Sequence, residues 1–329
     1  MSRTDPVNRL TGTAATHLGD TEPLTGPVPG PTERLFACAD LLSCPECGRD
    51  LTGQDRTLRC PRGHSFDLAK QGYVSLLTGS STRMTGDTPE MLDARAAFQA
   101  TGHFAPIAAA VARAVEPAVA REDGGNTVSS TTTTAPRRTD AAVLEIGAGT
   151  GYYLAAVLDA APAARGIAVD VSKPAVRRCA RAHRRAGAVL ADAWRGLPVR
   201  DGVLDAVLCV FAPRNAEEVA RVLTPDGRFV VVTPTERHLG ELIGPLAMVR
   251  VDADKQERLA RSLGARFELL ERTPVEYAMT LDHADIHRVV RMGPSAFHAA
   301  DTRDERVAAL PEPYPVTASV TVSVYRPRG

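Results

Sequence analysis

The stretch Val143-Leu144-Glu145-Ile146-Gly147-Ala148-Gly149-Thr150-Gly151 decides the fold, because it joins an apolar segment to a glycine-rich turn and a helical segment. Glycine has no Cβ atom, so closely spaced glycines let the backbone turn tightly and approach a bound ligand. The pattern predicts a strand–turn–helix unit that binds an adenosine-containing cofactor. By itself, a Gly-x-Gly-x-Gly turn does not distinguish one such cofactor from another, a nicotinamide dinucleotide included.

The sequence after this turn alternates between short apolar strands and helical segments. Residues 215–223, for example, carry apolar side chains at helical spacing, whereas 316–325 alternate and predict a half-exposed final strand. The predicted apolar strands are 142–146, 166–170, 188–191, 206–211 and 228–233. Strands that alternate with helices predict an α/β fold with a doubly wound, largely parallel sheet.

Acidic residues stand where the predicted strands end. Asp170 ends the second strand, where a carboxylate can accept both hydroxyls of a ribose, and Asp192 ends the third, placed to meet an adenine amine. With Glu145 just before the glycines, these features resemble the Class I (Rossmann-like) methyltransferases, which use S-adenosylmethionine. The alternative is a plain glycine turn with two solvent-exposed aspartates.

The spacing Cys44-x2-Cys47-x12-Cys60-x3-His64 supplies four ligands suited to one tetrahedral zinc ion. Four protein ligands leave no open coordination position, so we expect structural rather than catalytic zinc. Cys38 lies outside the spacing and is expected to be an unliganded thiol.

Length and composition favour one large domain with an appendage, because the chain has 329 residues and 44% hydrophobic residues. Lys plus Arg and Asp plus Glu number 39 each, so no net charge draws the chain to nucleic acid. The chain lacks an apolar run of about 18 residues and a secretory signal, so we expect a cytoplasmic protein without membrane association. We expect a disordered extension over 1–36, a zinc-binding module over 37–78, a helical connector over 79–121 that breaks near 102–104, a flexible low-complexity insertion over 122–140 and the methyltransferase domain over 141–329.

With both elements in place, residues 40–327 resemble the 23S rRNA (guanine-N1)-methyltransferases, including their macrolide-resistance branch in antibiotic-producing actinobacteria. The matching stretches are Cys60-Pro61-Arg62-Gly63-His64-Ser65-Phe66-Asp67, Gln71-Gly72-Tyr73-Val74-Ser75-Leu76-Leu77, Gly86-Asp87, Met91 with Ala94-Arg95, Gly102-His103-Phe104, Phe211-Ala212-Pro213-Arg214-Asn215, Thr233-Pro234, His238-Leu239 and Met292-Gly293-Pro294-Ser295. The resemblance implies methyl transfer to N1 of a guanine in a 23S rRNA hairpin, by a homodimer with an RNA cleft between its subunits. It further implies that the zinc module helps to hold the hairpin and that Phe104, Gly149, Thr150 and His238 line the cofactor pocket.

The exit of the fourth strand is the candidate catalytic segment, because it faces the sulfonium in this fold class. We expect Phe211 to stack on the target base and Arg214 or Asn215 to bind its oxygen edge as negative charge develops. The alternative makes Phe211 a core residue and Arg214 a surface residue at a helix start. Spacing identifies no general base for the proton on guanine N1.

The basic residues between 173 and 185 spread round a predicted helix, so a solvated face is favoured over an RNA track. Two other functions stay open. A small-molecule methyltransferase of secondary metabolism would share the cofactor domain but has no need of the zinc module. A non-catalytic RNA-binding or regulatory protein would have no need of the intact glycine turn.

Overall fold

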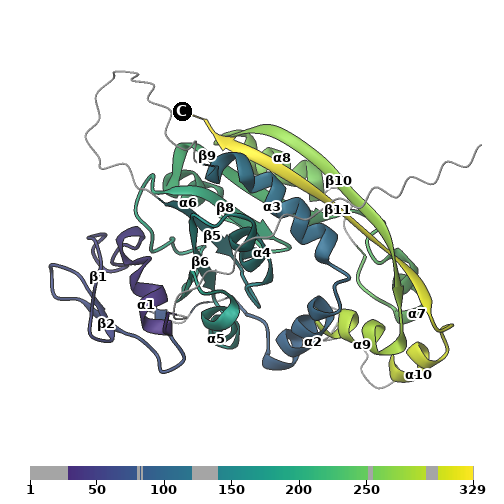
Figure 1. The fold of residues 1–329 in the computed structure, drawn as a ribbon. Helices are drawn as coiled ribbons and strands as arrows, with labels where there is room; N and C mark the ends of the chain where they lie inside the picture. The colour runs from purple at the N-terminus through teal and green to yellow at the C-terminus, as the bar shows by residue number, and fades with distance from the viewer. Residues whose placement is uncertain are drawn as a thin grey trace, which may run out of the picture.

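The computed structural model describes residues 29–79, 82, 84–120, 140–250, 255–293 and 303–328. A three-stranded antiparallel ribbon at the N-terminal end lies beside an eight-stranded sheet that is flanked by helices (Figure 1). The ribbon consists of β1 (Thr52–Gln54), β2 (Thr57–Arg59) and β3 (Ser65–Asp67).

The large sheet has the strand order β10-β11-β9-β8-β5-β6-β7-β4. Its strands are β4 (Tyr73–Ser75), β5 (Ala141–Ile146), β6 (Ala164–Asp170), β7 (Ala186–Leu190), β8 (Leu204–Val210), β9 (Leu223–Pro234), β10 (Phe267–Leu281) and β11 (Tyr314–Pro327). The strands from β4 to β9 pair in parallel, and β11 pairs antiparallel with both β9 and β10. The predicted doubly wound, largely parallel sheet is confirmed.

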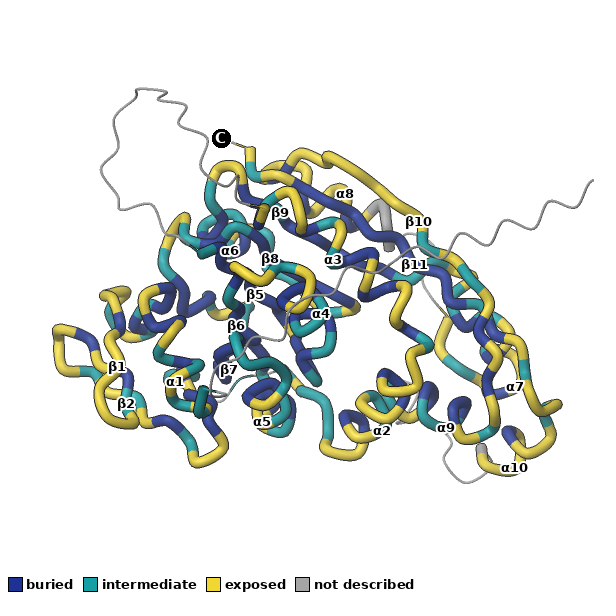
Figure 2. The backbone as a smooth tube through the Cα atoms, in the orientation of Figure 1, coloured by how far each residue is buried: buried dark blue, intermediate teal, exposed yellow. Residues whose placement is uncertain are grey.

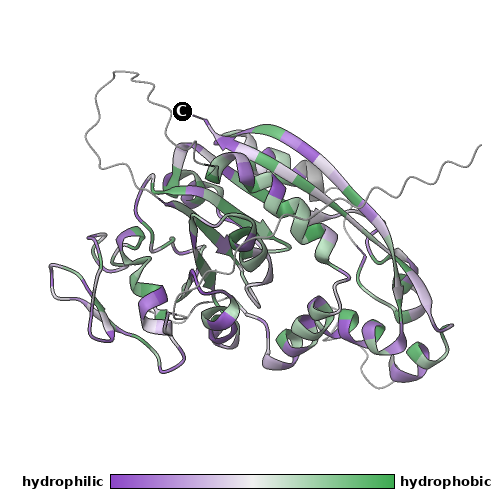
Figure 3. Cartoon of the chain, in the orientation of Figure 1, coloured by the Kyte–Doolittle hydropathy of each residue, from purple (hydrophilic) through white to green (hydrophobic). Residues whose placement is uncertain are grey.

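Helices cover both faces of this sheet. The helices after the ribbon are α2 (Pro89–Ala100), α3 (Ala105–Val119), α4 (Tyr152–Ala160), α5 (Lys173–Ala182), α6 (Ala216–Val222), α7 (Gly240–Leu246), α8 (Lys255–Gly264), α9 (His283–Arg291) and α10 (Arg303–Ala308), of which α2 and α9 pack against each other. Helices α3 and α4 pack on one face, whereas α6 and α8 contribute to the core on the other. Figure 2 shows the central strands buried between these layers, and Figure 3 shows their hydrophobic composition.

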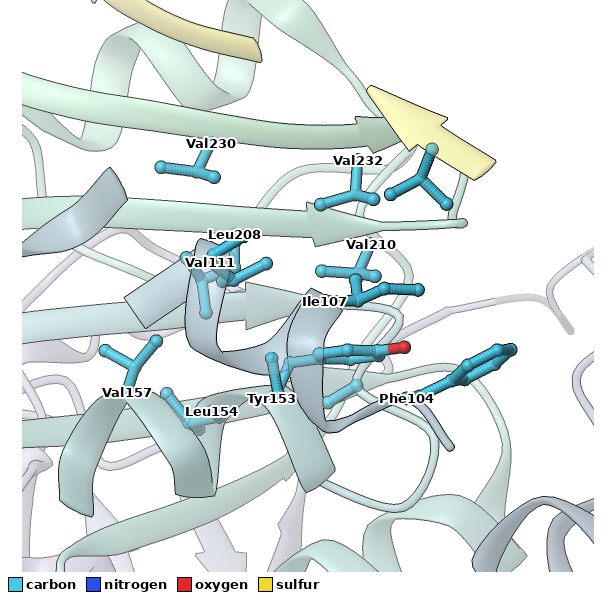
Figure 4. Packing of buried hydrophobic residues seen from close by; sticks show 14 of the residues in the cluster. Phe104, Ile107, Val111, Tyr153, Leu154, Val157, Leu208, Val210, Val230 and Val232 are labelled. Carbon is cyan, nitrogen blue, oxygen red and sulfur yellow. The ribbon is translucent and has the colours of Figure 1, made fainter. Parts of the chain in front are cut away.

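The central strands form because their side chains can be buried on both sides. In β5, Val143 belongs to the core under α3 and α4, whereas Leu144 and Ile146 belong to the core on the opposite face. Figure 4 shows Ile107 and Val111 of α3 in the same buried cluster as Val210 of β8 and Val232 of β9. Apolar runs of this kind are typical of parallel strands with helices on both faces.

The edge strand β10 was missed in the sequence because most of its side chains are exposed. It contains Pro274, a residue confined to edge strands and bulges. β10 is an end strand of the sheet and pairs only with β11, so polar side chains are tolerated along its length.

The N-terminal part is more structured than expected. The expected disorder over 1–36 is wrong at its end, because Pro31–Phe36 form helix α1 with Leu35 fully buried. Residues 1–28 lie outside the described part of the chain. The module is also not separate from the sheet, since β4 pairs with β7 and Leu35 shares a buried cluster with Val189.

The expected helical break is present, because α2 ends at Ala100, α3 begins at Ala105, and Gly102 between them has φ +83°. Both helices pack into the domain, so "connector" describes them poorly. The expected insertion over 122–140 falls almost wholly on residues 121–139, which lie outside the described part. Among the described residues, no helix is long and apolar enough to cross a membrane.

Candidate functional site

A cavity of about 810 Å³ opens at the carboxyl ends of the parallel strands. Its walls come from the segments that leave β5, β6, β7 and β8, from α2 and the turn into α3, and from α9. Of the residues expected to bind the cofactor, it is lined by Phe104, Glu145, Gly147, Thr150, Asp170, Asp192 and His238. In doubly wound sheets, this edge is where ligands bind.

The glycine turn takes the shape that its sequence predicts. Gly147, Gly149 and Gly151 have φ of +65°, +57° and +79°, a region that L side chains rarely adopt. A Cβ at Gly147 would lie 2.6 Å from Ala212, and one at Gly151 would lie 2.6 Å from Ala182. Gly149 and Gly151 sit behind the lining, so they shape the turn rather than face the cavity.

Two of the cavity's acidic residues are buried deeply enough to change their titration. Burial raises the pKa of Glu145 to about 8, and its Oε2 accepts the Leu154 N–H. Burial also raises the pKa of Asp170, although its oxygens accept the N–H groups of Gly149 and Ser172 at 2.9 and 2.8 Å. Asp192 accepts from the hydroxyl of Thr82 at 2.5 Å.

Aromatic rings gather at the exit of β8. Phe211 adopts a left-handed backbone conformation, with φ +55°, and is 41% exposed. Its ring stacks on His238 and lies edge-on to Tyr153. Figure 4 shows Phe104 and Tyr153 on this side of the core. A bulky residue held at positive φ is costly, and such positions cluster at functional sites.

His238 is held in one tautomer by the strand behind it. Its Nδ1 accepts the backbone N–H of Ser319 at 3.1 Å, so the neutral ring carries its proton on Nε2. Burial lowers the pKa of His238 to about 4. The imidazole is therefore neutral at physiological pH and offers the cavity a single N–H donor.

Arg214 and Asn215 stand outside the cavity lining, unlike Phe211. Asn215 caps α6, with its side chain accepting the Glu218 N–H and donating to the Ala193 carbonyl. The Arg214 guanidinium lies beside the buried thiol of Cys209 and opposes the burial that raises the pKa of that thiol. Direct contact of either residue with a target base is not supported by this placement.

Several lining residues were given no role by the sequence. Arg95 of α2 pairs with Asp87 at 2.5 Å, and Gln99 accepts the Thr150 hydroxyl at 2.6 Å. Trp194, which follows Asp192, is 52% exposed at the cavity wall. Of these residues, Arg95 could have been found from the sequence. It is a charged residue in a predicted helix, and it belongs to the family-matching stretch Ala94-Arg95.

The four predicted metal ligands come together. The ligand atoms of Cys44, Cys47, Cys60 and His64 all lie within 4.8 Å of one another. The sulfur atoms of Cys47 and Cys60 are 3.8 Å apart, and His64 Nδ1 lies 3.3 Å from Cys60 Sγ. Zinc–sulfur bonds of about 2.3 Å in a tetrahedron require sulfur separations of about 3.8 Å. The donor set therefore fits one structural zinc ion, and Cys38 lies outside it.

The cavity also fits S-adenosylmethionine on this structure's own terms. The hydroxyl of Tyr153 is buried at the cavity and has no hydrogen-bond partner among the described residues, which is costly unless a ligand supplies one. The carboxylates at the strand ends suit a ligand with a sulfonium, an ammonium and ribose hydroxyls. The volume is within the range of small-molecule sites.

Comparisons with known proteins agree with both parts of the structure. Residues 42–80 match the family model described as "RlmA, N-terminal", a zinc ribbon, and residues 143–227 match a "Methyltransferase domain". The 23S rRNA (guanine(748)-N(1))-methyltransferase of Streptomyces fradiae is 45% identical over 287 residues, which cover 87% of this chain and 96% of the relative. This chain belongs to the 23S rRNA (guanine-N1)-methyltransferase family.

Two further relatives, from Micromonospora griseorubida and Bacillus subtilis, are named provisionally as 23S rRNA (guanine-N(1)-)-methyltransferases. The first is 49% identical over 292 residues, covering 87% of this chain and 97% of the relative. The second is 29% identical, covering 86% and 95%. Membership of the family makes this chain a methyltransferase with S-adenosylmethionine as its cofactor and one structural zinc ion.

Proposed function

We propose that this protein transfers a methyl group from S-adenosylmethionine to N1 of a guanine in a hairpin loop of 23S rRNA. The observation that supports the proposal best is the Phe211 ring, which is partly exposed in the cavity and held at positive φ where β8 ends. Relatives that align with most of this chain are named for the same reaction.

When bound, S-adenosylmethionine supplies an electrophilic methyl group on its sulfonium. Phe211 is partly exposed although His238 stacks on it and Tyr153 lies edge-on to it, so a flipped-out base can stack on the exposed part of its ring. Positioning supplies most of the acceleration in such an in-line displacement. Phe211 is therefore the residue that we place against the base.

The proton on guanine N1 has to leave as the new bond forms. His238 is not its acceptor, because Nδ1 already accepts from Ser319 and Nε2 carries the ring proton. Glu145 is bonded to the Leu154 N–H within the core. We propose that a water molecule at the cavity opening accepts the proton. The Nε2–H of His238 would donate a hydrogen bond to an acceptor atom of the bound cofactor or base.

The zinc ribbon and helix α5 are proposed to hold the RNA backbone. Lys173, Arg177 and Arg181 are exposed at four-residue spacing on one side of α5, a row about 12 Å long. The helix starts beside the cavity residue Asp170, and Arg34 of α1 donates to the Ala180 carbonyl near its other end. This row leads from the cavity toward the N-terminal module.

Salt dependence tests this RNA path. Replacing Lys173, Arg177 and Arg181 by Gln should reduce the slope of log affinity against log salt by about 2 to 3 units. Replacing the exposed Arg113, Arg261 and Arg272 removes the same charge elsewhere and should leave the slope nearly unchanged. Equal effects of the two triple variants would contradict the path along α5.

The family resemblance supports three further parts of the proposal: assembly as a homodimer, a cytoplasmic location, and macrolide resistance as the physiological role. Analytical ultracentrifugation tests the dimer, and a monomer at working concentration would contradict it. Fractionation of the producing cells tests the location. Macrolide susceptibility with and without the gene tests the role in resistance.

The reaction itself is tested by incubating the protein and labelled S-adenosylmethionine with purified large-subunit rRNA. A separate incubation replaces the rRNA with a small-molecule extract of the source organism. Label in the rRNA supports the proposal. Label only in a metabolite would favour a small-molecule enzyme, and binding of RNA without transfer would favour a regulatory protein.

A further inference from the structure

Arg95 is a cation placed against the glycine turn. It extends from α2 to the cavity wall, where its Nη1 would lie 2.8 Å from a Cβ on Gly149. The side chain is 24% exposed and therefore reachable by a ligand. The guanidinium therefore lies directly against the glycine turn.

The guanidinium is held firmly and keeps donors to spare. Nη1 donates to Asp87 at 2.5 Å, and Nη2 donates to the Met292 carbonyl at 2.8 Å. A guanidinium has five N–H groups, so three of them, including Nε–H, have no acceptor among the described residues. The guanidinium is thus fixed by two hydrogen bonds and has three N–H groups available to a ligand. This arrangement is that of a preorganised anion site rather than of a purely structural ion pair.

The order of the strands indicates which end of the cofactor meets Arg95. Asp192 leaves β7, Asp170 leaves β6 and the glycine turn leaves β5, and these strands are neighbours in that order. An adenine at Asp192 and a ribose at Asp170 place the amino-acid end of the cofactor beside the glycine turn. That end bears the cofactor's one negative charge, its α-carboxylate.

The charge of the surroundings makes a cation necessary there. Asp87 and Asp170 line this part of the cavity and, when ionised, repel a carboxylate. Two other arginines line the described cavity, Arg250 and Arg258. Arg250 follows α7 and Arg258 belongs to α8, and neither is among the atoms nearest to the glycine turn. Arg95 is the cation that lies against the turn.

We propose that Arg95 anchors the α-carboxylate of the methionyl part of S-adenosylmethionine. The inference rests on the proposed function only for the identity of the cofactor. Bidentate pairing with a carboxylate requires the planar fork of arginine, which lysine does not reproduce. The site should therefore distinguish ligands that carry the carboxylate from those that lack it.

Calorimetry on the full-length protein tests the anchor with four ligands. S-adenosylmethionine and S-adenosylhomocysteine carry the carboxylate, whereas decarboxylated S-adenosylmethionine and 5′-methylthioadenosine lack it. Arg95→Gln should weaken binding of the first two by about 10- to 100-fold, as expected for lost charge-assisted hydrogen bonds, and change the last two by less than about threefold. Arg95→Lys should give an intermediate loss with the same selectivity.

The control is Arg178→Gln in α5, which breaks an ion pair to Asp93 of α2, the helix that also carries Arg95, without changing the cavity lining. It should leave all four affinities unchanged. Equal weakening of all four ligands by Arg95→Gln would overturn the anchor and make Arg95 a support for the turn. If that variant does not fold, Arg95→Lys decides, and an unchanged ratio between S-adenosylmethionine and its decarboxylated form would overturn the proposal. Failure of the wild-type protein to bind any ligand would instead contradict the proposed function.

Discussion

The ring of Phe211 stacks on the imidazole of His238, with centroids 5.8 Å apart and ring planes 25° apart. The two residues come from different strand exits, β8 and β9, and meet at the mouth of the cavity. His238 is in turn fixed to β11 through Ser319. The stack therefore joins the antiparallel end of the sheet to the place where a target base would enter.

Substitution of Phe211 tests whether its ring receives the base. Phe211→Ala should lower the affinity for rRNA by about 10- to 100-fold, because stacking of a base on an aromatic ring contributes about 1–3 kcal/mol. Alanine keeps a Cβ at the positive φ, so the backbone strain is not relieved. Phe211→Tyr is the matched control and should retain most of the affinity. An alanine variant with wild-type RNA binding would remove Phe211 from the base site.

His238 should show its tautomer directly in nitrogen NMR of the imidazole ring. The spectrum should report a proton on Nε2 and none on Nδ1 at pH 7, with a titration midpoint near 4, because the buried ring resists protonation. Titration of His238 near its ordinary value, or a proton on Nδ1, would reopen its role as a proton acceptor.

Glu145→Gln should change how the stability of the ligand-free protein depends on pH. The folded-state pKa of about 8 lies above the ordinary 4.5, so the stability present below pH 4.5 is lost as pH rises toward 8. Each pH unit in that window costs up to about 1.4 kcal/mol for one proton. Glutamine removes this loss, and the gain in melting temperature over wild type should grow from pH 5 to pH 8.

The exposed Glu217, which pairs with Arg266 on the surface, provides the matched control. Glu217→Gln should show a nearly constant difference in melting temperature over the same range. Parallel stability profiles for wild type and Glu145→Gln would mean that Glu145 is ionised in the folded protein.

Cys47→Ser should abolish stoichiometric zinc, because one of four ligands in a closed tetrahedral site is lost. The melting temperature should also fall by several degrees, since the ribbon shares a buried core with the sheet. Cys38→Ala, at a buried thiol that bonds to the Gly166 carbonyl, should keep one equivalent of zinc. Elemental analysis that finds the same zinc content in all three proteins would refute the site.

The sequence predicted those parts of the fold and site that depend on local pattern. The glycine turn, the zinc ligands and the five parallel strands each have a signature within a few residues. The strand β10 escaped because its exposed side chains leave no apolar alternation. Helix α1 escaped because its surroundings are rich in Pro and Gly, although burial of Leu35 stabilises it.

Contacts between distant segments explain the remaining differences. Arg95 meets Gly149 only after α2 packs beside the glycine turn, and β4 joins the sheet across more than a hundred residues from β7. Asn215 was expected near the base because it follows the exit of β8, but its side chain caps the first turn of α6 instead. The spacing of residues along the chain does not tell whether a polar side chain will bind a ligand or cap a helix.

The most direct test of the central claim is the identity of the methylated nucleoside. Purified 23S rRNA should be treated with the protein and S-adenosylmethionine, digested, and analysed by mass spectrometry against standards of the methylguanosine isomers. We predict one equivalent of 1-methylguanosine, mapped to a hairpin loop by a stop in reverse transcription and formed at least about 10-fold more slowly when Phe211→Ala is used at the same limiting RNA concentration. Methylation at another atom of guanine, at another base, or of no nucleoside at all would contradict the account.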